Sequence, residues 1–233
     1  MRCRARSLPS LLSKPLEFGA LLAYAPRPDE VVPALQAEAR RSRDLVLGLK
    51  AGHTFGDPPR TVAARIALYL RSAPSSSEIL AGLLRPSATL VPIPRSTLLT
   101  RGALWVPEQL AQELAKAGFG KVVATLLERT APIPKAATSL SAERPTARRN
   151  YETLGVRRAL EPPSELLLVD DVVTAGATLL GSASRLREAY PDIPIRAFAA
   201  ARTVSLASRF RTTVEPVVGT IALRPDGRTQ RDP

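Results

Sequence analysis

Cysteine and histidine are almost absent from this sequence, which has one of each in 233 residues, Cys3 and His53. A single cysteine excludes an intrachain disulfide and a zinc site built from several cysteines. A Ser-His-Asp triad or a histidine-based metal site would have to use His53, which lies in a loop-like run without a supporting motif. We therefore interpret His53 as a solvated loop residue and look for the chemistry elsewhere.

Aromatic residues and long apolar runs are also scarce. Phe, Trp and Tyr make up 4% of the chain, which leaves little material for stacking on the bases of single-stranded nucleic acid. No apolar run reaches the ~20 residues that a helix needs to span a bilayer. The chain begins with basic and Leu-rich sequence, but Pro9, Lys14 and Pro15 interrupt it before a signal core can form. We expect a cytoplasmic protein, with a cleaved targeting peptide as the alternative.

Basic residues, in contrast, are in excess. The 33 Lys and Arg residues outnumber the 21 Asp and Glu residues, the net charge is +12, and 28 of the basic residues are arginine. The paired donors of a guanidinium match two oxygens of a phosphate or carboxylate. This balance indicates a polyanionic partner, either a nucleic acid or a metabolite that carries pyrophosphate.

Composition divides the chain into three parts. Residues 1–28 are expected to form a poorly ordered extension, residues 29–223 the folded domain, and residues 224–233 a frayed polar tail. Within the domain, residues 29–85 carry two helical patterns and are expected to form a helical hood. Residues 86–223 are expected to form an α/β core.

Apolar periodicity in and before this core predicts strands that alternate with helices. Strands are expected at the apolar runs 88–93, 122–127, 165–169 and 195–201. Helices are expected at 29–49, 62–70, 106–117 and 179–190, the third closed by Gly118. Near-continuous apolar strands separated by helices indicate an α/β fold with a parallel sheet buried on both faces. In such sheets ligands bind at the carboxyl ends of the strands.

The most informative segment is LLLVDDVVTAGAT, residues 166–178. Two carboxylates, Asp170 and Asp171, end an apolar strand, and two adjacent carboxylates can accept hydrogen bonds from two vicinal hydroxyls. Gly176 allows a phosphate to approach the backbone, and the start of the following helix favours an anion. Thr174 and Thr178 offer hydroxyl donors. The plain alternative is a buried strand followed by a hydrogen-bonded turn and a Thr-capped helix, but the whole string favours a ribose phosphate site.

Two other classes of protein with an apolar strand that ends in Asp-Asp do not fit. A nucleoside triphosphatase needs a GxxxxGK[ST] phosphate loop, and the sequence has none. A receiver domain places its acidic pair near the start of the domain, whereas only 62 residues follow Asp171.

The segment 166–178 resembles the signature of the type I phosphoribosyltransferases, in which an apolar strand is followed by two acids and then Thr-Thr-Gly-x-Thr. More narrowly, the chain is similar to the competence-protein-F-like branch of that superfamily. The supporting strings are DLVLGLK at 44–50, VPIPR at 91–95 and Arg-Gly at 101–102. The resemblance covers residues 40–205 and implies a parallel-sheet core of this type, flanked by helices and with an N-terminal helical hood.

The resemblance also implies a role for individual residues. The ribose hydroxyls would be held by Asp170 and Asp171, and the pyrophosphate by the turn Pro94, Arg95 and Ser96. The 5-phosphate would be cradled by Thr174, Ala175, Gly176, Ala177 and Thr178. The mobile catalytic loop would correspond to the basic stretch around Lys135, Arg144, Arg148 and Arg149. The catalytic residues would be Asp170, Asp171 and Arg95, with Mg²⁺ bound through the substrate and through Asp170 or Asp171.

Three departures from the family pattern bear on activity. The cysteine-rich zinc module with which the branch usually opens is missing. Ala103-Leu104-Trp105 stands where the branch has Phe-Asn-Gln, and Ala175 replaces a threonine of the phosphate loop. The substitution at Ala175 removes a hydroxyl but no backbone donor, so phosphate binding is expected to persist. Trp105 is interpreted as a partly buried core residue, with a base-stacking platform as the alternative. Lys50 is interpreted as a snorkelling helix-end lysine, with a phosphate ligand as the alternative.

The expected function is transfer of a phosphoribosyl group from phosphoribosyl pyrophosphate to a nitrogenous acceptor, a base or an amine. The alternative is a non-catalytic accessory protein of DNA uptake that keeps the fold and the sugar-phosphate site and binds nucleic acid without sequence preference. The acceptor and the oligomeric state stay open, and a homodimer is among the alternatives.

Overall fold

Seven strands form one mostly parallel sheet in the computed structural model, which describes residues 12–98, 100, 102–134 and 145–233. Neighbouring strands follow the order β11-β10-β1-β9-β8-β4-β5. The five strands from β1 to β5 in this order are parallel, and β10 and β11 complete one edge as antiparallel strands. Their bounds are β1 Leu16–Tyr24, β4 Thr89–Pro92, β5 Val122–Val123, β8 Leu166–Val173, β9 Ile195–Thr203, β10 Val214–Leu223 and β11 Thr229–Asp232.

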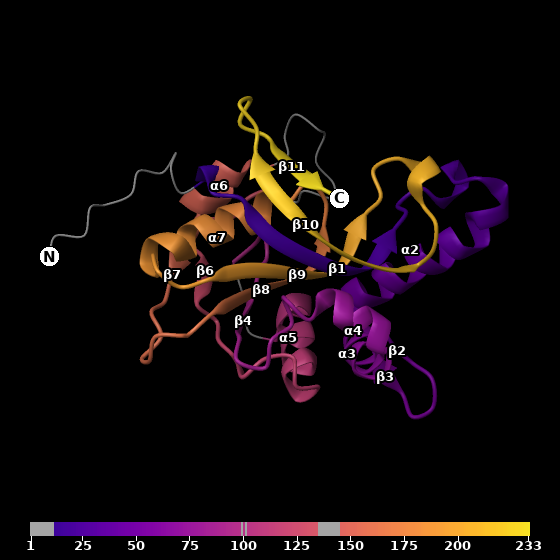
Figure 1. Cartoon of the computed structure of the whole chain (residues 1–233), viewed down its shortest axis with the longest axis horizontal. Helices are drawn as coiled ribbons and strands as arrows, with labels where there is room; N and C mark the ends of the chain where they lie inside the picture. Colours follow the sequence, from indigo (N-terminus) through magenta and orange to yellow (C-terminus); the bar gives the residue numbers. More distant parts are fainter. Residues whose placement is uncertain (1–11, 99, 101, 135–144) are drawn as a thin grey trace, which may run out of the picture.

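Helices cover both faces of this sheet (Figure 1). One face is packed by α2 Gln36–Ala51, α3 Val62–Ser72, α4 Pro74–Leu80 and α5 Val106–Lys116. The other is packed by α6 Ala147–Glu152 and α7 Ala177–Ala189. The remaining elements are two small sheets, β2 Thr54–Phe55 with β3 Arg60–Thr61 and β6 Leu127–Arg129 with β7 Leu154–Val156, and the short 3-10 helices η1 Pro28–Glu30, η2 Pro33–Leu35 and η3 Ala207–Arg209.

Strand β8 shows why the central strands are apolar without alternation. Leu167 and Val169 point into the core under α2–α5, whereas Leu166 and Leu168 point into the core under α6 and α7. Because successive side chains of a strand face opposite sides, a sheet covered on both faces requires an apolar residue at every position. The predicted α/β fold with a parallel sheet is therefore confirmed.

Most of the predicted core elements are confirmed. The strands expected at 88–93, 165–169 and 195–201 correspond to β4, β8 and β9, and the four expected helices correspond to α2, α3, α5 and α7. Helix α2 begins at Gln36 rather than at Asp29, after two 3-10 turns. The strand expected at 122–127 is shorter than predicted, because the chain leaves the sheet after Val123 and enters the separate β6.

Two predictions about the ends of the chain are wrong. Residues 16–24, expected within a poorly ordered extension, form β1 in the interior of the sheet, between β9 and β10. Residues 229–232, expected within a frayed tail, form β11 and pair with β10 from Thr220 to Leu223. Residues 16–24 are largely apolar, as a strand in the interior of the sheet requires, whereas residues 229–232 are polar and are ordered by their pairing with β10.

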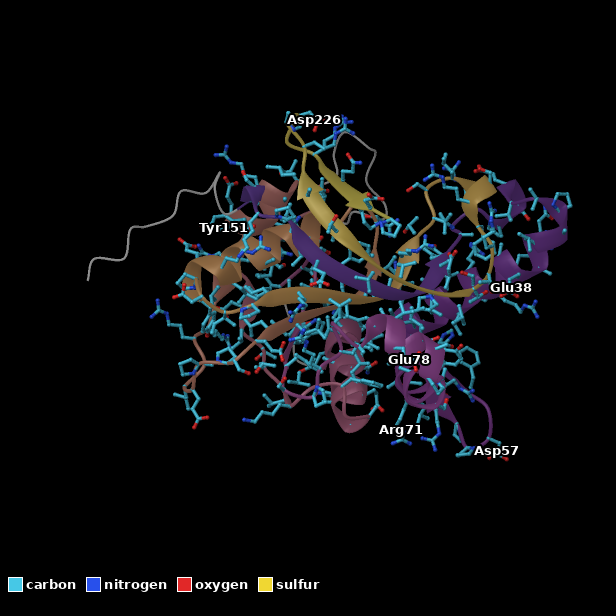
Figure 2. All side chains as sticks on the ribbon, viewed as in Figure 1. Glu38, Asp57, Arg71, Glu78, Tyr151 and Asp226 are labelled. Carbon is cyan, nitrogen blue, oxygen red and sulfur yellow. The ribbon has the colours of Figure 1, made fainter. Side chains whose placement is uncertain are left out.

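The helices of residues 36–80 pack directly on the sheet. Their apolar side chains join those of β1, β8 and β9 in one buried cluster. The charged side chains of Arg71 and Glu78 lie at the outer surface of this layer (Figure 2), whereas Glu38 of α2 is half-buried and accepts a hydrogen bond from the N–H of Thr213, next to β10. No helix in the described part of the chain is both long and apolar enough to cross a membrane.

Candidate functional site

The two carboxylates of the central motif lie near the carboxyl end of β8. Asp170 is paired with Ala199 of β9 and is buried, with 9% of its surface exposed, whereas Asp171 is half-buried. The backbone N–H of Asp171 donates to Asp170 Oδ1 (2.9 Å), and the N–H of Val172 donates to Asp171 Oδ1 (2.9 Å). These two bonds occupy one oxygen of each carboxyl group.

The electrostatic environment favours the protonated form of Asp170. Burial raises the pKa of Asp170 well above its ordinary value, and the charge of Asp171 acts in the same direction. The N–H of Asp171 and the charge of Lys50 oppose this increase in pKa. Lys50 is half-buried in the last turn of α2, as expected of a helix-end lysine, and its charge also acts on Asp170. A ligand that brings cationic charge or hydroxyl donors would stabilise the ionised form of Asp170.

The predicted phosphate turn, Thr174 to Thr178, lies between the end of β8 and the first turn of α7. Thr174 and Ala175 are exposed, and Ala177 and Thr178 are half-buried. Helix α7 begins at Ala177, and no side chain caps its N-terminus. The N–H groups of a first helical turn have no partners within the helix, and they carry the positive end of the helix dipole. An anion bound at this turn would satisfy them.

Gly176 is required at this turn for two reasons. Its φ of 84° lies in the left-handed region, which a residue with a Cβ adopts at a cost. A Cβ added to it would also lie 2.6–2.8 Å from three side-chain carbons of Ile221 on β10. The close packing of β10 on the turn therefore leaves no room for a side chain at Gly176, and it holds the turn against the sheet.

The predicted pyrophosphate turn, Pro94 to Ser96, follows β4, the strand next to β8. The N–H of Ile93 donates to the carbonyl of Val169 (2.9 Å), one residue before Asp170. Trp105 is buried and donates from Nε1 to the carbonyl of Ile93 (2.7 Å). The interpretation of Trp105 as a core residue is confirmed, and its indole holds this turn in place.

Arg95 and Ser96 are half-buried and lie at the same edge of the sheet as the acidic pair, since β4 and β8 are parallel neighbours. Pro94 is buried. The structure thus brings together the acidic pair and the two turns that the sequence places 80 residues apart. This edge is where ligands bind in parallel α/β sheets.

Sequence reasoning missed Arg129, a buried residue of β6 behind the Pro94–Ser96 turn. Its guanidinium donates to the carbonyl of Arg95 (3.1 Å), to Thr153 Oγ1 (2.8 Å) and to Asn150 Oδ1 (3.4 Å). No ion pair forms between Arg129 and a carboxylate of the described residues, and burial lowers the pKa of Arg129 to about 10. A buried positive charge without a carboxylate partner lies directly behind the turn. The only signal in the sequence is an arginine after the apolar Leu126-Leu127.

The predicted catalytic loop is only partly within the described residues, and Lys135 and Arg144 lie outside them. Arg148 and Arg149 belong to the exposed side of α6. Arg148 forms an ion pair with Glu152 one turn along the same helix (2.8 Å). In this conformation Arg148 is engaged in an ion pair at the surface.

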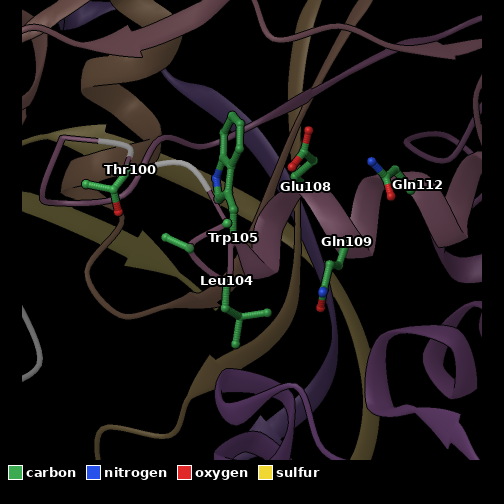
Figure 3. A pocket seen from close by; sticks show the side chains of 8 residues that line it. Thr100, Leu104, Trp105, Glu108, Gln109 and Gln112 are labelled. Carbon is green, nitrogen blue, oxygen red and sulfur yellow. The ribbon is translucent and has the colours of Figure 1, made fainter.

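A cavity of about 580 Å³ lies beside the start of α5, which follows the Pro94–Ser96 turn. Figure 3 shows Trp105 and Leu104 on one side of it and the polar side chains of the first turns of α5 along another. Its lining consists of Thr100, Gly102, Ala103, Leu104, Trp105, Glu108, Gln109 and Gln112. The carboxylate and the two carboxamides can accept hydrogen bonds from N–H groups.

Two negative findings bear on the assignment of this site. Within the described ranges, no group of three or more His, Cys, Asp or Glu side chains could hold a metal ion. A comparison of the sequence with protein-family models gives no match, and a comparison with curated proteins gives none either. The functional assignment therefore depends on the geometry of the sheet edge.

Proposed function

We propose that this protein binds phosphoribosyl pyrophosphate and transfers its phosphoribosyl group to a nitrogenous acceptor. One arrangement carries the proposal: the Asp170–Asp171 pair leads into an uncapped helix start on one side and is flanked by the Arg95 turn on the other. Acceptors for hydroxyl groups, donors for a monophosphate and positive charge for a diphosphate thus share one edge of the sheet. These three requirements together describe a sugar that is phosphorylated at both ends.

In the proposed reaction, Asp170 and Asp171 accept hydrogen bonds from the ribose hydroxyls and stabilise positive charge on the ring. The bond between the anomeric carbon and the pyrophosphate oxygen breaks, and its electron pair leaves with the pyrophosphate. The lone pair of the acceptor nitrogen forms the new bond to the anomeric carbon, and the nitrogen then transfers a proton to water. Arg95, with the charge of Arg129 behind it, stabilises the leaving pyrophosphate.

The residues present fit the expected Mg²⁺. This ion is typically held by one or two carboxylates, together with substrate phosphates and water, and it does not need an all-protein cage. The half-buried Asp171 would supply a carboxylate ligand, with the buried Asp170 as the second candidate. When bound, Mg²⁺ supplies charge neutralisation for the pyrophosphate oxygens.

The proposal extends to the finer features of the fold. The helices of residues 36–80 would act as the hood that confines the acceptor, and the sheet would be a type I phosphoribosyltransferase core. The position of Lys50 in α2, close enough to influence Asp170, supports a role for this layer in the site. The location in the cytoplasm and the formation of a homodimer stay predictions.

A thermal shift experiment tests the binding step. Phosphoribosyl pyrophosphate with Mg²⁺ should raise the Tm of the wild-type protein, by an amount that increases with ligand concentration. The double variant Asp170→Asn/Asp171→Asn should lose this shift and remain folded, since asparagine has nearly the same shape and can accept the same N–H bonds. A wild-type Tm that does not respond to the ligand contradicts the proposal.

A second experiment tests the transfer step. Release of pyrophosphate is measured with phosphoribosyl pyrophosphate, Mg²⁺ and a panel of nucleobases and simple amines. Turnover with one acceptor, lost in the double variant, supports a transferase. Binding without turnover for every acceptor limits the function to recognition of the sugar phosphate.

The net charge of +12 favours a second candidate, an accessory protein that associates with DNA and retains the sugar-phosphate site. A protein with this charge binds DNA at low salt regardless of its function, so the DNA affinity is measured at ~150 mM salt. Tight binding under these conditions, together with an absence of turnover, favours this candidate over the transferase.

A further inference from the structure

The C-terminal hairpin brings one arginine to the predicted phosphate turn. Arg231 of β11 is the cross-strand partner of Ile221 in β10, and such partners point to the same face of a sheet. Ile221 packs on Gly176 within the phosphate turn, so Arg231 lies on the face where this turn is found. The tip of the hairpin, marked by Asp226, extends away from the sheet, whereas β11 returns to it (Figure 2).

The guanidinium of Arg231 connects the ends of two parallel strands. Nη2 donates to the carbonyl of Thr203 (2.6 Å), the last residue of β9, and Nη1 approaches the carbonyl of Val173 (3.4 Å), the last residue of β8. Val173 immediately precedes Thr174, where the phosphate turn begins. The guanidinium also lies over the ring of Phe18, with Cζ 5.8 Å from the ring centroid. Arg231 is thus fixed beside the first residue of the turn.

The charges around Arg231 are not balanced. Burial lowers the pKa of Arg231 to about 10, and the charge of Arg202 on β9 contributes to this decrease. Glu215 pairs with Arg202, and among the described residues Arg231 itself forms no ion pair. Three buried polar atoms of this cluster, Arg202 Nε, Arg231 Nε and Thr203 Oγ1, have no hydrogen-bond partner in the described part of the chain. Of the two guanidinium groups at this edge, only that of Arg202 is paired with a carboxylate among the described residues.

A partly buried cation without a paired anion lowers the stability of the fold, and a bound anion would offset this loss. The phosphate turn, which begins one residue after Val173, is a feature beside Arg231 that is suited to an anion. We propose that Arg231 is a positioning residue of the sugar-phosphate site, which holds the start of the Thr174–Thr178 turn and places positive charge beside the bound 5-phosphate. This inference rests on the proposed function. It makes the C-terminal hairpin part of the site, although the hairpin contains no part of the motif.

The test compares two ligands and four variants by isothermal titration calorimetry, and one of the four, Arg95→Gln, is the control for the Arg95 turn. Ribose 5-phosphate probes the phosphate turn, and pyrophosphate probes the Arg95 turn. Arg231→Gln removes the charge, Arg231→Lys retains it, and Arg228→Gln removes the same charge from an exposed position on the same hairpin. Circular dichroism confirms that each variant is folded.

We expect Arg231→Gln to weaken ribose 5-phosphate binding about tenfold, as for the loss of a hydrogen bond or charge of ordinary strength. The Kd of this variant for pyrophosphate should stay within about twofold of the wild-type value. A general loosening of the fold would instead weaken the binding of both ligands. Arg231→Lys should retain most of the affinity for ribose 5-phosphate, and Arg228→Gln should retain all of it. Arg95→Gln should show the opposite pattern, with pyrophosphate binding weakened.

A measurement on the wild-type protein covers the case in which Arg231→Gln does not fold. Ribose 5-phosphate should slow amide hydrogen exchange in residues 229–232, because the ligand fixes the turn that Arg231 holds, and pyrophosphate should not. If ribose 5-phosphate binds equally well to Arg231→Gln, or if exchange in β11 does not respond to it, the role of Arg231 is refuted while the proposed function stands. If the wild-type protein binds neither ligand, the proposed function fails and this inference fails with it.

Discussion

Replacing Gly176 with alanine tests whether the turn before α7 is packed as tightly as the structure has it. The φ of 84° costs a residue with a Cβ about 1–2 kcal/mol. The new Cβ would lie 2.6–2.8 Å from three carbons of Ile221, and overpacking of this kind costs about 1–3 kcal/mol more. We therefore expect Gly176→Ala to lower the free energy of unfolding by about 2–5 kcal/mol in total.

A matched control separates the two contributions. Gly227 has a similar φ of 79°, but a Cβ added there meets nothing within 4 Å. Gly227→Ala should therefore lose only the backbone contribution of about 1–2 kcal/mol. Urea unfolding measures both variants, with the fluorescence of the single, buried Trp105 as the signal. If Gly176→Ala loses no more stability than Gly227→Ala, Ile221 does not pack on the turn in the way described.

A double-mutant cycle gives an independent check. Ile221→Ala alone removes a buried side chain and should cost about 2–5 kcal/mol. It also removes all three carbons that clash with the methyl group introduced by Gly176→Ala, so the double variant should lose about 1–3 kcal/mol less than the sum of the two single losses. Strictly additive losses would contradict the steric explanation. The backbone strain persists in the double variant, and its affinity for ribose 5-phosphate should stay below that of Ile221→Ala.

Three further predictions follow from the contacts of single residues. Because the pKa of Asp170 is raised in the folded state, the fold loses stability as the pH rises above ~3.9, the ordinary carboxyl value. Asp170→Asn should therefore raise Tm at pH 8 and raise it less at pH 4. Equal gains in Tm at the two pH values would contradict this reasoning. Trp105→Phe removes the Nε1 bond to Ile93 and should cost about 1–3 kcal/mol in urea unfolding followed by circular dichroism, with weaker pyrophosphate binding. Arg187→Met removes two donors to the carbonyls of residues 14 and 15 and should speed amide exchange at the start of β1, whereas unchanged exchange there would count against this clamp.

The elements that could be predicted from the sequence are those whose own pattern of apolar and polar residues matches their burial in the fold. Strand β8 is buried on both faces and is apolar throughout its first four residues, so its pattern identifies it. Strand β10 contains Pro216 and Gly219 and is only half-buried over most of its length, so no comparable pattern exists. Its place in the sheet is decided by pairing with β1, a segment nearly two hundred residues away.

In the candidate site, too, some residues could be predicted from the local sequence and others could not. The motif that contains Asp170, Asp171 and Gly176 is recognisable because it lies between an apolar strand and the start of a helix in one continuous segment. Arg129 and Arg231 reach the site only through tertiary contacts, and each is one arginine among 28 in the sequence. The guanidinium of Arg129 meets the carbonyl of Arg95 only after β6 has packed beside the turn. Such residues can be assigned only from coordinates.

The location of β1 has a consequence for biosynthesis. This strand leaves the ribosome first among those of the sheet, yet its neighbours β9 and β10 begin at Ile195 and Val214. At 5–20 residues per second, its apolar side chains remain without their final neighbours for on the order of ten seconds or more. The nascent chain therefore carries an unpaired, aggregation-prone segment during most of its translation, and a chaperone that recognises apolar extended peptides is expected to bind residues 16–24 until synthesis is nearly complete.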